Sequence, residues 1–267
     1  MKEINILGFG VMARQIAALF LLLGYKINIY NKTIANQDLI EKQLRLLQKK
    51  LPYLENINNQ GGGITFHLGF KILKDLPTIE SISENLQIKK ELILDFQKNF
   101  KSPIFSNSSS FSYDDLSCPL MHFFNPIYIN LVEIYNPKNE CLELIEDLKN
   151  NHFIIINSKG NRASLANLIL FGEFSNIFKI IEQLHYTQEE CQMIYNLLYE
   201  KRNIFNIIDT IGIDICEEIF KNIKENDPNF YHPKSFTKAL KENILGKKNK
   251  TSIKDVLQFS NQKTLLS

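Results

Sequence analysis

The sequence predicts an α/β fold, a Rossmann-like, doubly wound and mostly parallel sheet followed by an all-helical C-terminal domain. Short apolar segments alternate with helical patterns over the first half of the chain, which is typical of a sheet with helices on both faces. A turn with two glycines joins the first strand to the first helix. After Ser158 only helical spacing continues, so we expect two domains, at residues 1–158 and 159–267.

Local signals give the expected elements of the first domain. Residues 3–7 form a short buried strand, and residues 11–23 form an apolar helix ended by Gly24. Residues 26–30 alternate and are β-branched, as in a second strand. The further expected elements are helix 34–50, loop 58–63, strand 78–82, helix 86–100, strand 104–106, strands 121–124 and 131–135, helix 141–150 and strand 153–156.

The second domain shows helical spacing without a convincing strand. Isoleucines recur at helical spacing between Ile207 and Ile219, so this face is expected to be core or a dimer interface. The basic stretch after Gly246 is expected to be loose. The four candidate helices cover residues 165–178, 188–201, 205–223 and 234–245.

Composition excludes several classes of function. The chain has 267 residues and a formal net charge of +2, which gives no argument for nucleic acid or a membrane surface as a partner. The apolar run at residues 16–23 is far too short to span a bilayer. No two cysteines form a CxxC pair, so we expect reduced thiols, a cytoplasmic protein and no metal site. The cysteines are Cys118, Cys141, Cys191 and Cys216.

The turn Gly8-Phe-Gly10-Val-Met12-Ala13 predicts a dinucleotide site, because it follows a strand and opens a helix. Gly8 permits the tight turn, Gly10 lets the backbone approach a phosphate, and Ala13 allows close packing of helix on strand. The helix N-terminus adds free N–H groups and partial positive charge. An ordinary strand–helix turn is the alternative.

The end of the second strand bears on which dinucleotide binds. NAD-binding folds usually place an acidic residue there to accept hydrogen bonds from the adenosine ribose, whereas this chain has Asn31 and Lys32. The amide of Asn31 can still bond the ribose, while Lys32 can attract a 2′-phosphate. We expect NAD, with NADP or no functional dinucleotide as alternatives.

The segment His122-Phe-Phe-Asn125-Pro126, with Glu133 downstream, carries the predicted chemistry. A neutral histidine can take the proton of an alcohol while a carboxylate fixes its tautomer. A proton acceptor beside a cofactor that takes a hydride predicts an alcohol dehydrogenase. The alternative for His122 is a hydrogen-bonded core residue, which is the role expected for His67, His152, His185 and His232.

Six motifs, in the same order, resemble those of the L-3-hydroxyacyl-CoA dehydrogenase family, which includes 3-hydroxybutyryl-CoA dehydrogenases. The resemblance covers nearly the whole chain. Each motif alone is weak evidence, but their order across both domains indicates the family's fold. The motifs lie at residues 6–12, 79–89, 106–110, 122–133, 208–214 and 246–250.

The resemblance implies reversible NAD-dependent oxidation of a short-chain (3S)-3-hydroxyacyl-CoA to the 3-oxoacyl-CoA, in a homodimer formed by the helical domain. It implies that His122 is the general base, that Glu133 orients it, and that Ser109 and Asn125 bond the reacting oxygen and thioester region of the substrate. The full cofactor-binding set expected is Gly8, Gly10, Met12, Ala13, Asn31, Lys32 and, along the nicotinamide ribose, Glu84, Lys89 and Asn107.

The chain also departs from the family pattern. The spacing from His122 to Glu133 is one residue shorter than expected, which would shift the carboxylate. The substrate-binding Asn of the family falls on Ser164 in an ungapped alignment, or on Asn161 with a deletion; the distance to Glu173 favours Ser164. The alternatives are therefore a non-catalytic homologue that binds nucleotide or acyl-CoA, and a dehydrogenase of a free 3-hydroxy acid.

Two further segments have more than one interpretation. Ser106–Ser110 is either a polar loop at a strand end or a ligand contact, since open α/β sheets bind ligands at this position. A basic stripe on the second expected helix is either a solvated face or a contact for the phosphates of coenzyme A. The stripe consists of Lys42, Arg45, Lys49 and Lys50.

Overall fold

The structure is a computed structural model that describes residues 2–54, 63–70, 73–137, 142–199 and 203–261. It divides into two compact units, unit 1 at residues 1–165 and unit 2 at residues 166–267. The loop expected at residues 58–63 lies outside the described residues, apart from Gly63.

Unit 1 is built on one mostly parallel sheet. Its strands are β1 (Glu3–Leu7), β2 (Lys26–Asn31), β3 (Ile64–Leu68), β4 (Thr78–Glu80), β5 (Ile104–Ser106), β6 (Leu120–Phe123), β7 (Leu131–Tyr135) and β8 (Ile154–Asn157). They are ordered β3-β2-β1-β4-β5-β6-β7-β8. Only β6 and β7 pair antiparallel. β1 and β4 lie side by side, with β2 and β3 added on one side of this pair and β5 to β8 on the other. This reversal of strand order confirms the predicted doubly wound fold.

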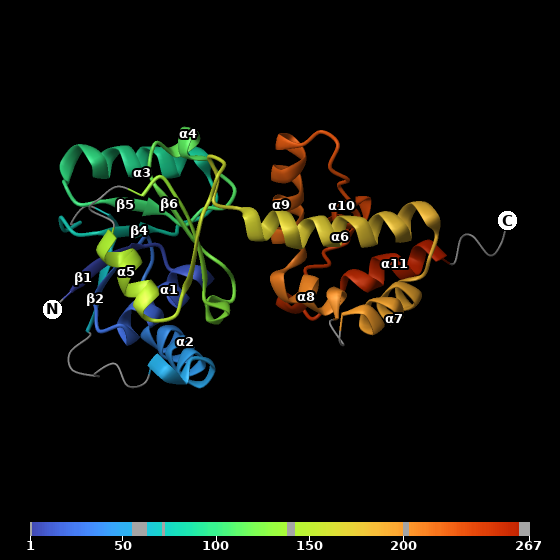
Figure 1. The fold of residues 1–267 in the computed structure, drawn as a ribbon, viewed down its shortest axis with the longest axis horizontal. Coiled ribbons are helices and arrows are strands. Elements are labelled where there is room, and N and C mark those ends of the chain that lie inside the picture. Colours follow the sequence, from blue (N-terminus) through green and yellow to red (C-terminus); the bar gives the residue numbers. More distant parts are fainter. Residues whose placement is uncertain (1, 55–62, 71–72, 138–141, 200–202, 262–267) are drawn as a thin grey trace. The chain divides into compact units, whose positions relative to one another are not determined.

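Helices cover both faces of this sheet (Figure 1). One face packs against α1 (Val11–Leu22), α2 (Gln37–Lys50) and α5 (Leu142–Asn150), and the other against α3 (Leu86–Asn99) and α4 (Tyr113–Leu116). Neighbouring residues of a strand alternate between the two cores, as the two-residue period requires. In β1, for example, Ile6 belongs to the first core and Leu7 to the second.

Strand β3, the start of α2 and the short helix α4, which was not predicted, differ from expectation in unit 1. Strand β3 was not predicted, although Ile64-Thr-Phe-His-Leu68 alternates; it lies at the sheet edge and is only partly buried, so its apolar signal is weak. Helix α2 begins at Gln37, three residues later than predicted. Asn36 caps it by accepting a hydrogen bond from the Asp38 N–H, and such a cap fixes where a helix starts.

The turn between β1 and α1 depends on a glycine. Gly8 has φ of +107°, and a Cβ at this position would lie 2.4 Å from the Ser81 carbonyl oxygen. The backbone of the turn therefore lies against the chain that follows β4. Gly10, by contrast, has an ordinary φ of −66°, and a Cβ there would meet nothing within 4 Å.

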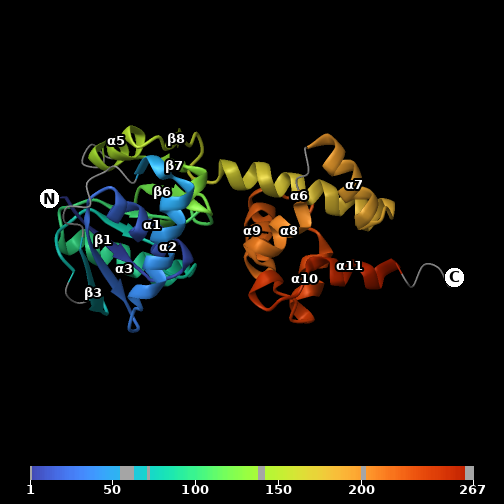
Figure 2. The ribbon, with the colours of Figure 1, turned by 90° about the horizontal axis from the view of Figure 1, so that it is seen from below.

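Unit 2 is a bundle of helices (Figure 2). Its core is a cluster rich in phenylalanine. Phe220 packs edge-to-face against Phe171, with ring centroids 5.1 Å apart, and in a tilted arrangement against Phe236 at 4.8 Å. The helices are α6 (Leu165–Leu184), α7 (Gln188–Leu198), α8 (Ile204–Ile211), α9 (Ile213–Asn226), α10 (Lys234–Lys241) and α11 (Ile253–Asn261), with a 3-10 turn, η4, at Gly246–Lys248.

Two predictions for unit 2 were wrong. A single helix was expected at residues 205–223, but the structure has two. Gly212 has φ of +103°, which no α-helix contains, so α8 ends there and α9 begins after it. The described part of the stretch after Gly246, up to residue 261, is ordered rather than loose. Asp209 accepts hydrogen bonds from Ser252 Oγ at 2.6 Å and from the Ile253 N–H at 2.8 Å, which fixes the start of α11.

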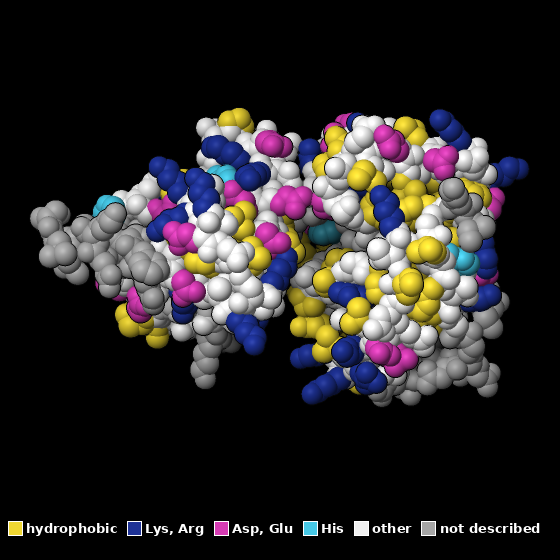
Figure 3. All heavy atoms as spheres, turned by 180° about the vertical axis from the view of Figure 1, so that it is seen from behind, with side chains coloured by type: hydrophobic (Ala, Val, Ile, Leu, Met, Phe, Trp, Pro, Cys, Tyr) yellow, Lys and Arg dark blue, Asp and Glu magenta, His cyan; other side chains and the backbone are white. Residues whose placement is uncertain are grey.

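Neither positive nor negative side chains dominate the molecular surface on the face shown in Figure 3. Basic and acidic side chains are mixed over that face, in keeping with the net charge of +2. Among the described residues, no helix combines the length and the apolar character needed to cross a bilayer.

Glu217 on α9 is a buried carboxylate that ties this helix to α10. His232 Nε2 lies 2.7 Å from Glu217 Oε2, Thr237 Oγ1 donates to Oε1 at 2.8 Å, and Lys221 Nζ lies 3.4 Å from Oε1. Burial raises the pKa of Glu217, but these hydrogen bonds and the neighbouring positive charges outweigh it and hold the pKa below its ordinary value.

We expect Gly8→Ala to destabilise the protein by roughly 1–3 kcal/mol or more, because the added Cβ requires a strained φ and overlaps the Ser81 carbonyl. Gly10→Ala is the matched control and should change stability by no more than about 0.5 kcal/mol. Urea unfolding followed by circular dichroism measures both. Equal stabilities of the two variants would contradict this account of the turn.

We expect Glu217 to make unit 2 sensitive to acid. A carboxyl whose pKa is lower in the folded protein contributes stability that is complete above its unfolded pKa and is lost as the pH falls through the folded value. The melting temperature of the wild type should therefore fall more steeply below about pH 4.3 than that of Glu217→Gln, which cannot titrate. Parallel pH profiles of the two proteins would show that this carboxylate does not supply the acid sensitivity.

Candidate active site

The loop from Gly8 to Ala13 has the geometry that a pyrophosphate needs. Gly10 is the N-cap of α1, and no side chain caps the helix or places an acid in its first turn. The first N–H groups of α1 are therefore available, together with the positive end of the helix dipole. The open space around Gly10 admits a phosphate, and buried Ala13 permits close packing below it. These residues fit a bound dinucleotide.

Asn31 and Lys32 lie at the carboxyl end of β2. The amide nitrogen of Asn31 donates to the Thr33 carbonyl at 3.0 Å and to Thr33 Oγ1 at 2.9 Å. Lys32 is exposed. The Asn31 side chain is thus engaged in the turn that follows the strand, and its contact with the adenosine ribose stays a prediction.

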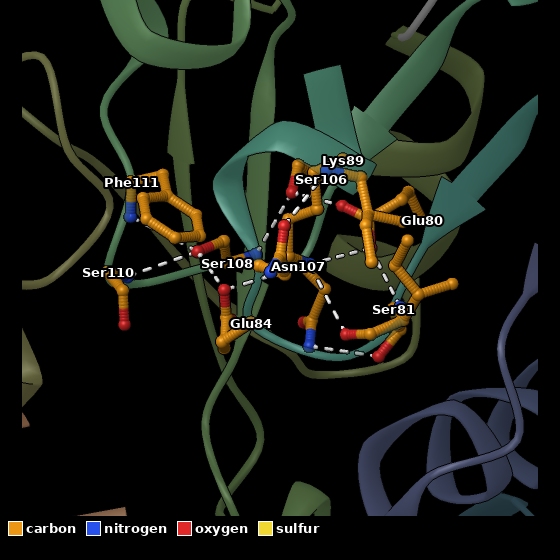
Figure 4. A network of polar contacts seen from close by, with 12 residues as sticks. Glu80, Ser81, Glu84, Lys89, Ser106, Asn107, Ser108, Ser110 and Phe111 are labelled. Atoms are coloured by element: carbon orange, nitrogen blue, oxygen red, sulfur yellow. Dashed lines mark hydrogen bonds and ion pairs between the residues drawn. The ribbon is translucent and has the colours of Figure 1, made fainter. Parts of the chain in front are cut away.

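A buried polar network joins the ends of β4 and β5 (Figure 4). Glu80, fully buried, accepts from Lys89 Nζ at 2.6 Å, from Ser106 Oγ at 2.6 Å and from the Ile82 N–H at 2.7 Å. Lys89 is only 1% exposed. A buried ion pair is tolerated only when such additional hydrogen bonds satisfy it, so this network fixes the two strand ends relative to α3.

The network also contains Glu84, and Lys89 reaches it more loosely than it reaches Glu80. Ser108 Oγ donates to Glu84 at 3.0 Å, while Lys89 Nζ lies 3.7 Å from the Glu84 carboxylate. Lys89 was predicted to line the nicotinamide ribose, and the structure places its ammonium inside the protein against Glu80. Glu84 is the more accessible member of this pair, with its side chain 31% exposed.

Asn107 connects this network to the strand that carries His122. The Phe123 N–H donates to Asn107 Oδ1 at 2.9 Å, and Asn107 Nδ2 donates to Ser81 Oγ at 3.4 Å. The ends of β4, β5 and β6 therefore meet through one amide side chain. Since Gly8 lies against the Ser81 carbonyl, the nucleotide loop lies at the same edge of the sheet, the one formed by the carboxyl ends of β1, β4, β5 and β6.

His122 and Glu133 face each other across the antiparallel pair β6/β7, where they are register partners. His122 Nδ1 lies 3.6 Å from Glu133 Oε2, slightly beyond hydrogen-bond distance. The two residues are 8% and 1% exposed. The connection is one residue shorter than expected, and the register places the carboxylate opposite the imidazole.

The predicted substrate residues occupy different surroundings. Asn125 is exposed just after β6, and its Oδ1 accepts from Gln15 Nε2 at 3.1 Å. Ser109 and Ser164 are partly buried, the latter immediately before α6. Asn161, the alternative to Ser164, donates instead to Asp114 Oδ2 at 2.7 Å. These roles therefore stay predictions.

Three residues that shape this site were not predicted. Glu80 acts through Lys89 and Ser106, 9 and 26 positions later, and Gln15 acts through the segment after β6, 110 positions later. Arg162 donates to the Ser110 carbonyl and lies 3.6 Å from Asp115. For Glu80 and Gln15 the available signal was a charged or amide residue within an apolar strand or helix, which marks a buried polar contact without naming its partner. Arg162 lies in the loop between β8 and α6, where no such signal exists.

Comparison with known proteins identifies the family. The profile of the 3-hydroxyacyl-CoA dehydrogenase NAD-binding domain matches residues 3–151, more than half of the chain. No curated protein sequence matches.

Solved structures resemble the fold over nearly its whole length. M. tuberculosis FadB2 is 18% identical with a TM-score of 0.77, covering 95% of this chain and 98% of its own. The (S)-3-hydroxybutyryl-CoA dehydrogenase PaaH1 from Ralstonia eutropha is 20% identical, with the same TM-score and coverage. A 5-formyl-3-hydroxy-2-methylpyridine 4-carboxylic acid 5-dehydrogenase, described as an NAD⁺-dependent dismutase, is 15% identical with a TM-score of 0.70, covering 99% of this chain and 96% of its own.

These identities are low, so the structures show the fold, while the family profile shows descent and the nature of the cofactor domain. The chain belongs to the 3-hydroxyacyl-CoA dehydrogenase family, as a divergent oxidoreductase whose N-terminal unit carries the family's NAD-binding domain.

Proposed function

We propose that the protein catalyses the reversible oxidation of a short-chain (3S)-3-hydroxyacyl-CoA to the 3-oxoacyl-CoA. The observation that carries the proposal is the His122–Glu133 pair, with 3.6 Å between Nδ1 and Oε2, on the sheet edge that also bears the Gly8–Ala13 loop. Residues 1–158 would bind the cofactor, and residues 159–267 would form the helical substrate and dimerisation domain.

His122 would act through its Nε2 atom, because Nδ1 faces Glu133. In oxidation, Nε2 takes the proton of the 3-hydroxyl while the carboxylate stabilises the imidazolium that forms. Bound NAD⁺ supplies the acceptor for the hydride that leaves the same substrate carbon. In reduction, the imidazolium returns its proton to the oxygen. The His122–Glu133 contact is expected to shorten when substrate is bound, as such contacts often do.

Ser109 and Asn125 would bond the reacting oxygen and the thioester region. Hydroxyl and amide N–H groups stabilise an oxygen on which charge develops, and they do so best when their direction is fixed in advance. Glu84 and Asn107 would lie along the nicotinamide ribose. Both are held by other residues of the site, by Ser108 and by the Phe123 N–H respectively.

The basic stripe on α2 supports a coenzyme A ester as the substrate. Its four members are all exposed, so their charges are available to phosphates. A free 3-hydroxy acid lacks those phosphates and offers the stripe only the single charge of its carboxylate. The stripe consists of Lys42, Arg45, Lys49 and Lys50.

A homodimer would be formed through unit 2. The outer face of α7 exposes a group of large apolar side chains, which is unusual for a helix that meets only water. A symmetric interface between two copies of this chain would cover them. They are Met193, Ile194, Leu197 and Leu198, at 57%, 50%, 76% and 68% exposed.

We expect purified protein to oxidise NADH in the presence of acetoacetyl-CoA, followed by absorbance. His122→Ala should lower kcat about 10²–10⁴-fold, because the proton-transfer group is lost. Glu133→Gln should lower kcat by at least about tenfold, because an amide favours the wrong tautomer. Both variants should keep the Kd for NADH.

The controls separate the alternatives. Acetoacetate replaces the thioester in a parallel assay, and faster turnover of the free acid would favour a dehydrogenase of free hydroxy acids. Calorimetry tests whether the wild type binds NADH and acetoacetyl-CoA. If it binds both but reduces neither acetoacetyl-CoA nor acetoacetate with NADH or NADPH, the proposal is rejected in favour of a non-catalytic binding protein.

We expect Leu197→Lys to dissociate the dimer, because it places a charge in an interface otherwise made of apolar side chains. Light scattering after gel filtration measures the mass of each species. Lys179→Ala, a change on α6 that removes a charge and leaves α7 intact, is the control. A wild type that elutes as a monomer of 31.0 kDa at all concentrations would reject the dimer.

A further inference from the structure

Gln15 connects the helix that bears the nucleotide loop to the segment that bears Asn125. It lies on α1, two residues after Ala13, and is 6% exposed. The Ile127 N–H donates to Gln15 Oε1 at 2.9 Å, and Gln15 Nε2 donates to Asn125 Oδ1 at 3.1 Å. One buried side chain thus bonds two points of the segment that follows β6.

These two bonds determine which way both amides face. A backbone N–H can only donate, so the Gln15 atom opposite Ile127 is the oxygen. The nitrogen of Gln15 then faces Asn125. Because this nitrogen can only donate, Asn125 must offer its oxygen to it. The nitrogen of Asn125, with two N–H groups, points away from Gln15, and the exposure of Asn125 leaves it accessible to a ligand.

We propose that Gln15 is a positioning residue that sets Asn125 as a hydrogen-bond donor toward the reacting oxygen of the substrate. This inference rests on the proposed function, which assigns that oxygen to Asn125. During reduction, a hydride from NADH bonds to C3, the C3–O π bond breaks, and the oxygen gains negative charge until it takes the proton of His122. An N–H aimed at that oxygen lowers the barrier, whereas an amide oxygen in the same place would raise it.

Gln15→Glu tests the orientation with little change in shape. When ionised, the introduced carboxylate can accept from Ile127 but cannot donate to Asn125, so Asn125 turns its N–H inward and offers its oxygen to the substrate. We expect kcat for acetoacetyl-CoA reduction to fall about 10²–10³-fold, with the Kd for NADH unchanged. Acid should restore activity, because the protonated carboxyl is again a donor, and burial raises the pKa of such a group.

Two controls separate this role from a merely structural one. Gln15→Met removes both bonds and cannot titrate, so its activity relative to the wild type should not depend on pH. In the Asn125→Ala background, Gln15→Glu should have no further effect on kcat, because the group through which it acts is gone. A deficit of Gln15→Glu that is independent of pH, or that persists in full without Asn125, would overturn the inference.

The outcomes also distinguish this inference from the proposed function. An active wild type whose Gln15→Glu variant is equally active at every pH sinks the inference alone. An inactive wild type sinks the proposed function and, with it, the catalytic role of Gln15. The bond between the two amides is then judged by urea unfolding, where additive shifts of the midpoint from Gln15→Glu and Asn125→Ala would show that it does not exist.

Discussion

The buried carboxylate of Glu80 is the constraint on which the candidate site depends. A carboxylate removed from water costs several kcal/mol unless its oxygens are satisfied, and here Lys89, Ser106 and the Ile82 N–H satisfy them. Each partner comes from a different segment, α3, β5 and the chain after β4. The charge therefore requires these three segments to meet in one arrangement, since separating any of them would leave a buried ion short of a partner.

The rest of the sheet edge follows from that arrangement. Ser106 is held by Glu80, and its neighbour Asn107 bonds the Phe123 N–H and Ser81. Phe123 is adjacent to His122, so the imidazole is positioned by a chain of hydrogen bonds that starts at the buried ion pair. A site supported in this way by the ends of rigid strands keeps its geometry better than one built on loops alone.

Local sequence signals sufficed for most of the fold, because they report burial along one element at a time. The strands at residues 104–106 and 131–135 were predicted with the observed bounds, and Gly24 ends α1 in the left-handed region as expected. The signals failed where the determining contact is distant. Strand β3 depends on pairing with β2, and the order after Gly246 depends on Asp209, more than forty positions earlier.

The residues of the candidate site likewise fall into those that the sequence predicted and those that it did not. Residue types indicated His122, Glu133 and the glycine turn, because their chemistry is visible one residue at a time. Glu80 and Gln15 were not found, because each matters only through a partner that the sequence does not identify. A family pattern cannot supply such partners when, as here, the chain is about one fifth identical or less to the solved structures it resembles.

The register of β6 on β7, and not the number of residues between them, places Glu133 opposite His122. In an antiparallel pair, the residue opposite a given position is set by the ladder of hydrogen bonds between the strands, and a slip of one residue would turn every side chain to the other face. Both faces of β6 and β7 are largely buried, so such a slip would turn Glu133 into the apolar core that Val132 and Ile134 occupy and is strongly disfavoured. A change in length between the two strands would therefore fall on their connection, which here contains the 3-10 turn Ile127–Ile129 (η2). The number of residues between two functional groups on a hairpin is therefore a poor measure of their separation, and strand register is the better one.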